Sequence, residues 1–421
     1  MNRPSHYQSP YRWTVLVVNF LFLTFAYAGL STWSIAVPEL SKSFNLTPDM
    51  TQLGSSMLMA GYALGSFFEA LIAARIGFKA TGILAAVLLL VPQFLIPFTP
   101  SYGLILFMRF VQGWGIVWFV TVSITNGWFS TEQRGLASGI NSGAIPFGVG
   151  IGGILVGWLL TVVGTWQNAF IYFGVIVLVV AVIWAILAKN PPAEEPSAVV
   201  ARGPRSMLNP YKLAAGWLVA FCLFMNAFSL IGLYSVMPSY LYTLGLSTSD
   251  AGTAILFAGL IGVISTPLGG TLSDWYIRRG ADPTKARAYV MAIPGFLVAA
   301  VATALFPYIA PAGFGMVLLV SVLAGWGVPL TNASIGSLPN DMLGDPEVAG
   351  KLFGLIILVG ISGAVISPYL ATWIATTMGW SAAFMVLGFA ALVGVVLGLI
   401  IPNYKVSPER IPPEAGPHAV A

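Results

Sequence analysis

The chain has 421 residues, of which 57% are hydrophobic and only 8% charged, with 46 glycines and 28 prolines. Together with a mean hydropathy of +0.88, this composition excludes a soluble domain and indicates an integral membrane protein. The net charge of +4 does not indicate nucleic acid binding, because the basic residues stand in short loops between apolar stretches.

Twelve apolar stretches are long enough to cross a bilayer, for which a helix needs about 20 residues. Their runs are continuous and lack the period-two alternation of a membrane barrel, so each is expected to be a helix. The predicted spans are Trp13–Val37, Gln52–Ala74, Thr81–Phe98, Leu104–Asn126, Gly135–Val163, Asn168–Leu187, Ala214–Met237, Ala251–Ser273, Ala288–Ile309, Gly313–Ser334, Leu352–Thr377 and Ala382–Ile401.

Arg12, the apolar run after it and the small residues Ala26 and Ala28 imitate a signal peptide. Cleavage there would leave eleven spans and break the internal symmetry, so we expect the first helix to be retained. With both termini in the cytoplasm, every loop lysine and arginine except Lys42 lies inside, as the positive-inside rule favours. The sequence therefore predicts a multi-pass protein of the cytoplasmic (inner) membrane with both termini cytoplasmic.

The two halves of the chain repeat each other. The segment Gly164–Phe170 entering span six returns as Gly379–Phe384 entering span twelve, and the Gly-Trp-Gly of residues 113–115 returns at 325–327. Weak internal symmetry is typical of transporters whose substrate site lies near the midplane, between two halves. The predicted division is an N-terminal six-helix bundle over 1–189, a cytoplasmic linker over 190–213, a C-terminal six-helix bundle over 214–402 and a cytoplasmic tail over 403–421.

Only two charged residues, Glu69 and Arg109, fall inside the predicted spans. A charge within hydrocarbon is costly and rare, so each is a candidate functional residue. Glu69 lies near the cytoplasmic end of span two and Arg109 near the outer end of span four, so the two are not expected to touch.

A loop motif follows span eight. Its residues, Gly270–Gly280, place Asp274 at the end of a helix and Arg278 and Arg279 in the turn after it. Asp274 can pair with cytoplasmic arginines or a neighbouring helix end and so latch one conformation. This segment resembles the cytoplasmic-loop signature of the major facilitator superfamily, and Arg109–Gly115 in span four resembles a second signature. The resemblance implies an all-α membrane protein of twelve helices in two pseudo-symmetric bundles, working as a secondary transporter by alternating access.

The corresponding loop after span two departs from the family pattern. Arg75–Lys79 keeps its basic part, but Ala74 occupies the position of the usual aspartate. Glu69 either supplies the missing acid of the latch or carries a proton, since a desolvated carboxyl group can titrate near neutrality. We prefer the latch, because span two usually lines the interface between the halves, and both interpretations stay open.

A finer resemblance is to the anion:cation symporter branch, whose members carry organic acids with protons. It rests on Gln133–Gly143 entering span five, on the run from Ser273 to Arg287, and on the Asn190–Pro192 exit from span six. Taken together, these segments imply that the substrate is a small organic anion, such as a carboxylate.

The departures from this branch concern charge. The branch has an Asp-Arg pair in span one where this chain has Gly29 and Leu30, and often a glutamate in span four where it has Ile116. A carboxylate would then need Arg109, the end of a broken helix, or neutral donors. Arg109 has a structural or gating alternative, through hydrogen bonds to backbone carbonyls of span one. The candidate substrate-binding residues are Tyr27, Arg109, Trp114, Asn141, Ser142, Asn226, Tyr234, Trp326 and Asn332, and those for coupling or gating are Glu69, Arg75, Asp274, Arg278 and Arg279.

Two further features have both a packing and a functional interpretation. Trp114 and Trp326 stand in symmetric positions and either pack between helices or line the cavity and stack on a substrate. The small-residue and proline runs over 143–153 and 360–368 allow close helix approach and bending; the first also loosely resembles an antiporter motif of the superfamily.

No catalytic set, phosphate-binding loop or metal-ligand cluster appears in the sequence. We therefore predict a transporter of a small organic anion rather than an enzyme, with no cofactor, no metal and no nucleic acid. Its partners would be the small-molecule substrate, a proton if transport is proton-coupled, and the lipid bilayer, and it would work as a monomer. The alternatives are an exporter or antiporter of an amphipathic or neutral compound and a non-transporting membrane sensor of the same fold.

Overall fold

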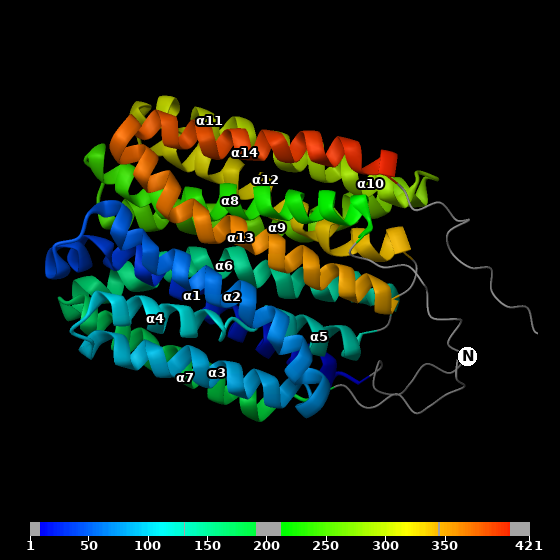
Figure 1. Cartoon of the computed structure of the whole chain (residues 1–421), viewed down its shortest axis with the longest axis horizontal. Coiled ribbons are helices and arrows are strands. Elements are labelled where there is room, and N and C mark those ends of the chain that lie inside the picture. Colours follow the sequence, from blue (N-terminus) through cyan, green and yellow to red (C-terminus); the bar gives the residue numbers. More distant parts are fainter. Residues whose placement is uncertain (1–8, 130, 191–211, 344–345, 405–421) are drawn as a thin grey trace, which may run out of the picture.

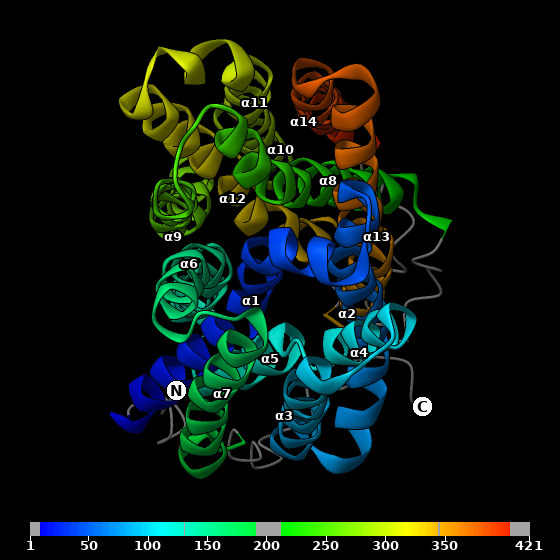
Figure 2. The same ribbon diagram turned by 90° about the vertical axis from the view of Figure 1, so that its left-hand side faces the viewer.

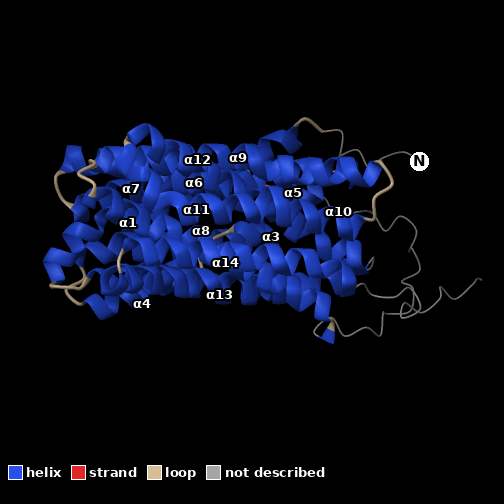
Figure 3. Ribbon diagram, turned by 90° about the horizontal axis from the view of Figure 1, so that it is seen from above, coloured by secondary structure: helices blue, strands red, loops and turns tan. Residues whose placement is uncertain are grey.

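The computed structural model describes residues 9–129, 131–190, 212–343 and 346–404, and every regular element within them is a helix (Figure 3). In lipid, backbone polar groups must be satisfied within the segment, which favours helices. The first half contains α1 (Tyr11–Phe44), α2 (Pro48–Ile76), α3 (Phe78–Leu95), η2 (Ile96–Phe98), α4 (Tyr102–Gly113), α5 (Trp118–Trp128), α6 (Thr131–Val163) and α7 (Trp166–Leu187). The second half contains α8 (Ala214–Thr243), α9 (Thr248–Arg278), α10 (Pro283–Val290), η4 (Met291–Leu297), α11 (Val298–Ile309), η5 (Ala310–Ala312), α12 (Phe314–Leu343), α13 (Pro346–Met378), α14 (Trp380–Ile400) and η6 (Ile401–Tyr404).

The expected all-helical membrane fold is confirmed. Eleven stretches of described residues are long and apolar enough to span a bilayer. The remaining expected span is α2, in which the side chains of Ala70, Leu71 and Ala74 are not described. The placement of the termini in the cytoplasm stays a prediction.

The helices run side by side along the long axis (Figure 1) and gather into two groups when seen end on, α1 to α7 below and α8 to α14 above (Figure 2). The two groups meet where α6 packs on α9 and α2 packs on α13. We call the end of the molecule at Leu187 and Ala214 the linker end, which the sequence predicts to be cytoplasmic. The exact limits of the four predicted divisions remain predictions, and residues 191–211 and 405–421 lie outside the described residues.

Three expected elements differ in detail. Span four is interrupted: α4 ends at Gly113, three i to i−3 hydrogen bonds follow, and α5 begins at Trp118. Span nine contains the π-helical segment η4 around Pro294, a residue that has no backbone N–H to donate. The motif expected as a loop after span eight is mostly helical, because α9 continues to Arg278 and only Arg279 and Gly280 form the turn.

The internal repeat is visible in the backbone. Gly164 and Gly379, which precede the repeated tryptophans, both adopt positive φ, at 73° and 96°, a conformation that glycine accepts without strain. The two Gly-Trp-Gly segments also pack alike. A Cβ on Gly113 would lie 2.0 Å from the carbonyl oxygen of Leu58, and one on Gly325 would lie 2.2 Å from that of Ala258. Both glycines therefore let the fourth helix of their bundle touch the backbone of the second.

Candidate functional site

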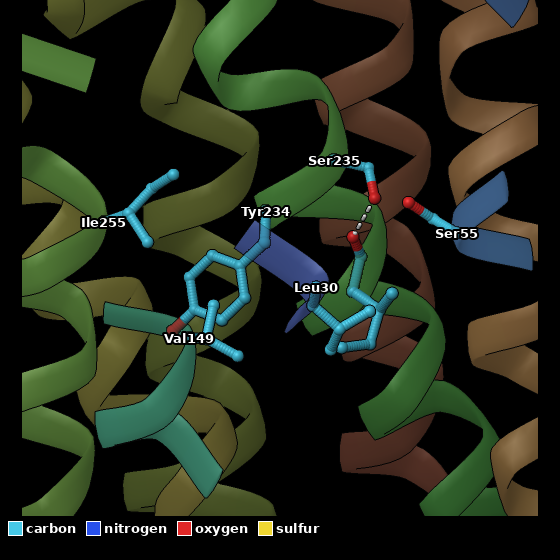
Figure 4. A pocket seen from close by; sticks show the side chains of 7 residues that line it. Leu30, Ser55, Val149, Tyr234, Ser235 and Ile255 are labelled. Atoms are coloured by element: carbon cyan, nitrogen blue, oxygen red, sulfur yellow. Dashed lines mark hydrogen bonds between the residues drawn. The ribbon is translucent and has the colours of Figure 1, made fainter. Parts of the chain in front are cut away.

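A small cavity lies between the two bundles. Leu30, Ser55 and Val149 line it from α1, α2 and α6 of the first half (Figure 4). From the second half, α8 contributes Ile231, Tyr234 and Ser235, and α9 contributes Ile255. Its volume is about 10 Å³, which holds about one water molecule, so this state is closed around the cavity. We call it the inter-bundle pocket.

The polar groups of the inter-bundle pocket are neutral hydroxyls. The Tyr234 hydroxyl and the Ser55 Oγ are buried and have no hydrogen-bond partner among the described residues. Ser235 donates instead to the carbonyl oxygen of Ile231 at 2.7 Å (Figure 4). Tyr234 and Ser55, which come from opposite bundles, therefore hold unused hydrogen-bonding capacity toward a ligand.

Leu30 occupies the position of the arginine in the Asp-Arg pair of the anion:cation symporter branch. It lines the inter-bundle pocket. Gly29 precedes it, and an added Cβ at Gly29 would meet nothing within 4 Å. The replacement of a charged residue by leucine at this position therefore makes part of the pocket wall apolar. An anion bound here would be held by neutral donors.

The interface between the bundles is closed on both sides of the pocket. Toward the linker end, the rings of Trp118 in α5 and Phe353 in α13 meet with centroids 5.9 Å apart. At the opposite side, the Gln52 amide of α2 donates to the backbone oxygen of Ser235 in α8 at 3.5 Å. Among the described residues, the two bundles are therefore in contact on both sides of the pocket.

Arg109 does not line the inter-bundle pocket. It is fully buried in α4, where its Nε donates to the Gly54 carbonyl at 3.2 Å and its Nη1 to the Gln112 side chain at 2.7 Å. Its guanidinium carbon lies 4.9 Å from the ring centre of Trp33, a favourable cation–π distance. The sequence interpretation placed the hydrogen bonds of Arg109 on backbone carbonyls of span one. In the structure the carbonyl belongs to Gly54 of span two, and span one supplies the aromatic ring of Trp33.

The same hydrogen bonds extend across the N-terminal bundle. Gln112 donates to Gln93 in α3 at 2.6 Å, and Gln93 donates to the Phe170 carbonyl in α7 at 2.9 Å. Arg109 thereby links four helices of one bundle, an arrangement that favours its structural interpretation. Gln93 and Gln112 were not among the predicted residues, although both are polar residues within predicted spans.

Glu69 is buried in α2, with 4% of its surface exposed. Neither carboxyl oxygen has a hydrogen-bond partner among the described residues. Glu69 is 15 residues from Gly54, the partner of Arg109, or about 22 Å along a helix, so these two charged groups act separately. Tyr62, two turns before Glu69, meets Tyr27 edge-on with ring centroids 6.0 Å apart.

Asn141, Ser142 and Asn226 each join two helices of their own bundle. Asn141 donates to the Thr121 hydroxyl at 3.2 Å, and Ser142 accepts from the Trp118 indole at 3.4 Å. Asn226 donates to the Val328 carbonyl at 3.0 Å and to the Thr331 hydroxyl at 2.6 Å. Asn332 is partly buried in α12.

The two symmetric tryptophans are also away from the inter-bundle pocket. Trp114 lies in the interruption of span four and stacks on Phe68, whose side chain is 40% exposed at the bundle surface. Trp326 is partly buried in α12. Of the predicted substrate-binding residues, Tyr234 alone is among those that line the pocket.

The acidic residue of the loop motif is paired. Asp274 lies 2.6 Å from Nη2 of Arg287, whose Nε donates to Asp341 at 3.1 Å. Arg287 also donates to Ser273 at 2.6 Å, so from the last turn of α10 it joins the ends of α9 and α12. The partners Arg287 and Asp341 were not predicted as site residues, since their proximity depends on three separate helices.

The other predicted gating residues are exposed. Arg75 and Arg278 lie on the surface, and the guanidinium of Arg279 stacks at 3.7 Å over the ring of Trp275. Among the described residues, none of these three arginines contacts Glu69. Their role as a latch stays a prediction.

A pocket between two repeated helical bundles is the arrangement typical of a membrane transporter. The sequence model of the Major Facilitator Superfamily matches residues 20–281 and 284–420. The chain therefore belongs to that superfamily. It is a multi-pass protein of the inner membrane, and its relatives are those of the anion:cation symporter-like branch.

Curated relatives match over nearly their whole length. The "Hexuronate transporter" of Bacillus subtilis is 26% identical, covering 89% of this chain and 92% of its own. The "Probable galactarate/D-glucarate transporter GarP" of Escherichia coli is 24% identical over 93% and 94%, and the "Probable sulfoacetate transporter SauU" of Cupriavidus necator is 26% identical over 93% and 94%.

Among solved structures, a bacterial homolog of the human lysosomal transporter Spinster in an inward-facing, unoccupied conformation superposes with a TM-score of 0.75. It is 16% identical, and the match covers 95% of this chain and 99% of that one. This likeness shows the shared fold.

Proposed function

We propose that this protein moves a small organic anion, a sugar acid or a related carboxylate, across the inner membrane by alternating access at the inter-bundle pocket. The observation that carries the proposal is a pocket whose two hydroxyls without a partner among the described residues, those of Ser55 and Tyr234, come from different bundles. When the bundles rock apart, a ligand held by both loses one side of its contacts and becomes accessible. The names of the relatives supply the substrate class.

The described residues that line the pocket include no cation, and this has a consequence for recognition. Hydroxyls donate hydrogen bonds to a carboxylate but also accept from sugar hydroxyls, so a polyhydroxylated acid fits this lining better than a bare hydrocarbon acid. Arg109 acts through the packing of the N-terminal bundle and does not touch the substrate. The transporter works as a monomer in this proposal.

The test is uptake into liposomes that contain the purified protein. Radiolabelled D-glucuronate, D-glucarate and sulfoacetate would be offered separately, with empty liposomes as background. Uptake of at least one acid that unlabelled acid competes away supports the proposal. If none is taken up or competes, organic anion transport is excluded.

One observation favours a second candidate, the export of a neutral or amphipathic compound. The pocket wall at Leu30 carries no charge, which suits an uncharged substrate. Thermal-shift screening with organic acids, neutral sugars and drug-like cations separates the two functions, because a ligand stabilises the protein that binds it. Stabilisation by neutral compounds alone would support the second.

A further inference from the structure

Glu69 is a buried acid that the inter-bundle pocket does not use. Among the described residues, Glu69 and Arg109 are the charged side chains that are buried. Arg109 has hydrogen bonds and an aromatic face, whereas neither oxygen of Glu69 has a hydrogen-bond partner among the described residues. An ionised carboxylate in such surroundings is far more costly than a neutral carboxylic acid.

The position of Glu69 connects it to the moving interface. It lies on α2, the helix that packs against α13 of the opposite bundle. Gly65, one turn earlier, abuts Trp114 so closely that a Cβ would lie 2.8 Å from the Trp114 Cα. Glu69 therefore sits beside the interruption of span four, at the level where Trp118 meets Phe353 and closes the linker end.

Among the described residues, no charged side chain forms a hydrogen bond or ion pair with Glu69. On α2 itself, Tyr62 lies two turns before Glu69 and meets Tyr27 of α1, Arg75 is exposed at the end of the helix, and the side chain of Asp49 is outside the described residues. The helix α5 carries no titratable residue. The other titratable groups on helices packed against α2 are Tyr11, Arg12, Glu39 and Lys42 on α1, Lys79 on α3, Tyr102 and Arg109 on α4, and Tyr369 on α13, with the side chains of Glu347 and Lys351 outside the described residues.

We propose that Glu69 is the proton-binding site of this transporter and that the linker end closes only when Glu69 carries a proton. With the linker end open, water reaches α2 and the carboxylate can ionise. With it closed, as here, the carboxyl group must be neutral. The closed state therefore forms with a bound proton. Proton movement is thereby coupled to the change of access to the inter-bundle pocket from one side of the membrane to the other. This proposal rests on the proposed transport function and names its coupling ion.

The first experiment compares Glu69→Gln with Glu39→Gln, a matched change at an exposed acid of α1. Liposomes would carry an inward proton gradient of one pH unit, with the membrane potential held at zero, and D-glucuronate as probe. One proton per monoanion predicts about tenfold accumulation for the wild type and for Glu39→Gln. Glu69→Gln is expected to show no accumulation but to retain exchange of labelled for unlabelled D-glucuronate. Equal accumulation by Glu69→Gln and wild type would overturn the proposal.

A second measurement does not depend on transport, so it separates failure of this proposal from failure of the proposed function. Infrared spectra of the protein in liposomes at neutral pH should contain a carboxylic acid C=O band that is present in the wild type and Glu39→Gln and lost in Glu69→Gln. A band of the same size in Glu69→Gln, or no band in the wild type, contradicts a protonated Glu69 whether or not any anion is transported.

Discussion

Arg109 and Gly54 join two helices of the N-terminal bundle: the Nε of Arg109 donates to the carbonyl oxygen of Gly54 at 3.2 Å, directly beneath the ring of Trp33. Gly54 must be a glycine here, since a Cβ would lie 2.1 Å from that same ring. A buried cation is thus held by a backbone oxygen, a glutamine and an aromatic face, and no carboxylate of the described residues is among its contacts.

Replacing Arg109 with glutamine should destabilise the protein rather than weaken substrate binding. Hydrogen bonds to charged groups contribute about 1.5–3 kcal/mol each, and the Oε1 of Gln112 would lose its charged donor. We expect a clear fall in the thermal unfolding midpoint, with the KM of the folded fraction within about twofold of wild type. A KM raised tenfold or more with unchanged stability would place Arg109 in the substrate site.

Replacing Tyr234 with phenylalanine should raise KM for a transported acid. A lost hydrogen bond to a charged group, about 1.5–3 kcal/mol, corresponds to roughly 10-fold to 100-fold weaker binding. Ser235→Ala is the matched control, because the Ser235 hydroxyl is already occupied by the Ile231 carbonyl. Concentration-dependent uptake would measure both, and equal KM values in the two variants would remove Tyr234 from the binding site.

Two glycine substitutions should behave oppositely. Gly113→Ala would place a Cβ 2.0 Å from the Leu58 carbonyl oxygen, a backbone clash that forces α4 away from α2. Gly29→Ala meets nothing within 4 Å and should keep its folding yield and unfolding midpoint. Size-exclusion profiles and thermal unfolding in detergent provide the comparison. Equal stability of both variants would show that α2 and α4 do not need this close approach.

Replacing Phe353 with alanine should favour opening of the linker end. An aromatic pair is worth about 0.5–1.5 kcal/mol beyond its buried area, which shifts a two-state equilibrium by roughly 2-fold to 10-fold. Distances between spin labels on α5 and α13 would report the population. An unchanged distribution in Phe353→Ala would mean that the Trp118 contact does not hold the linker end closed.

Asp341 should give the C-terminal bundle a pH dependence. Burial raises its pKa above the ordinary value, and Asp274 and Asp282 add to this, while Arg287 partly offsets it. A raised folded-state pKa contributes stability that is fully present below the ordinary pKa of about 4 and is lost as pH rises through the raised one. The thermal midpoint should therefore contain a component that declines with rising pH in this window and is missing in Asp341→Asn. Parallel curves for the two proteins would contradict the shift.

Much of the architecture follows from local composition. Apolar runs of sufficient length must be helical in lipid, because no other partner exists for the backbone. The repeated segments before Trp166 and Trp380 likewise carried their turn geometry in a glycine, and both turns have positive φ. The sequence could not reveal the interruption after Gly113, since its partner Gly325 stands in an unbroken helix.

The sequence by itself determined the membrane class, the helices, their duplication and the family, because each depends on hydropathy and residue order along one segment. The tertiary structure decided which polar residues share a site. Leu30, Ser55 and Tyr234 come from helices far apart in the chain and meet only when the two bundles pack together. In the same way, two buried charges that look equivalent in a hydropathy profile become different: Arg109 acquires partners from neighbouring helices, and Glu69 is buried with no hydrogen-bond partner among the described residues.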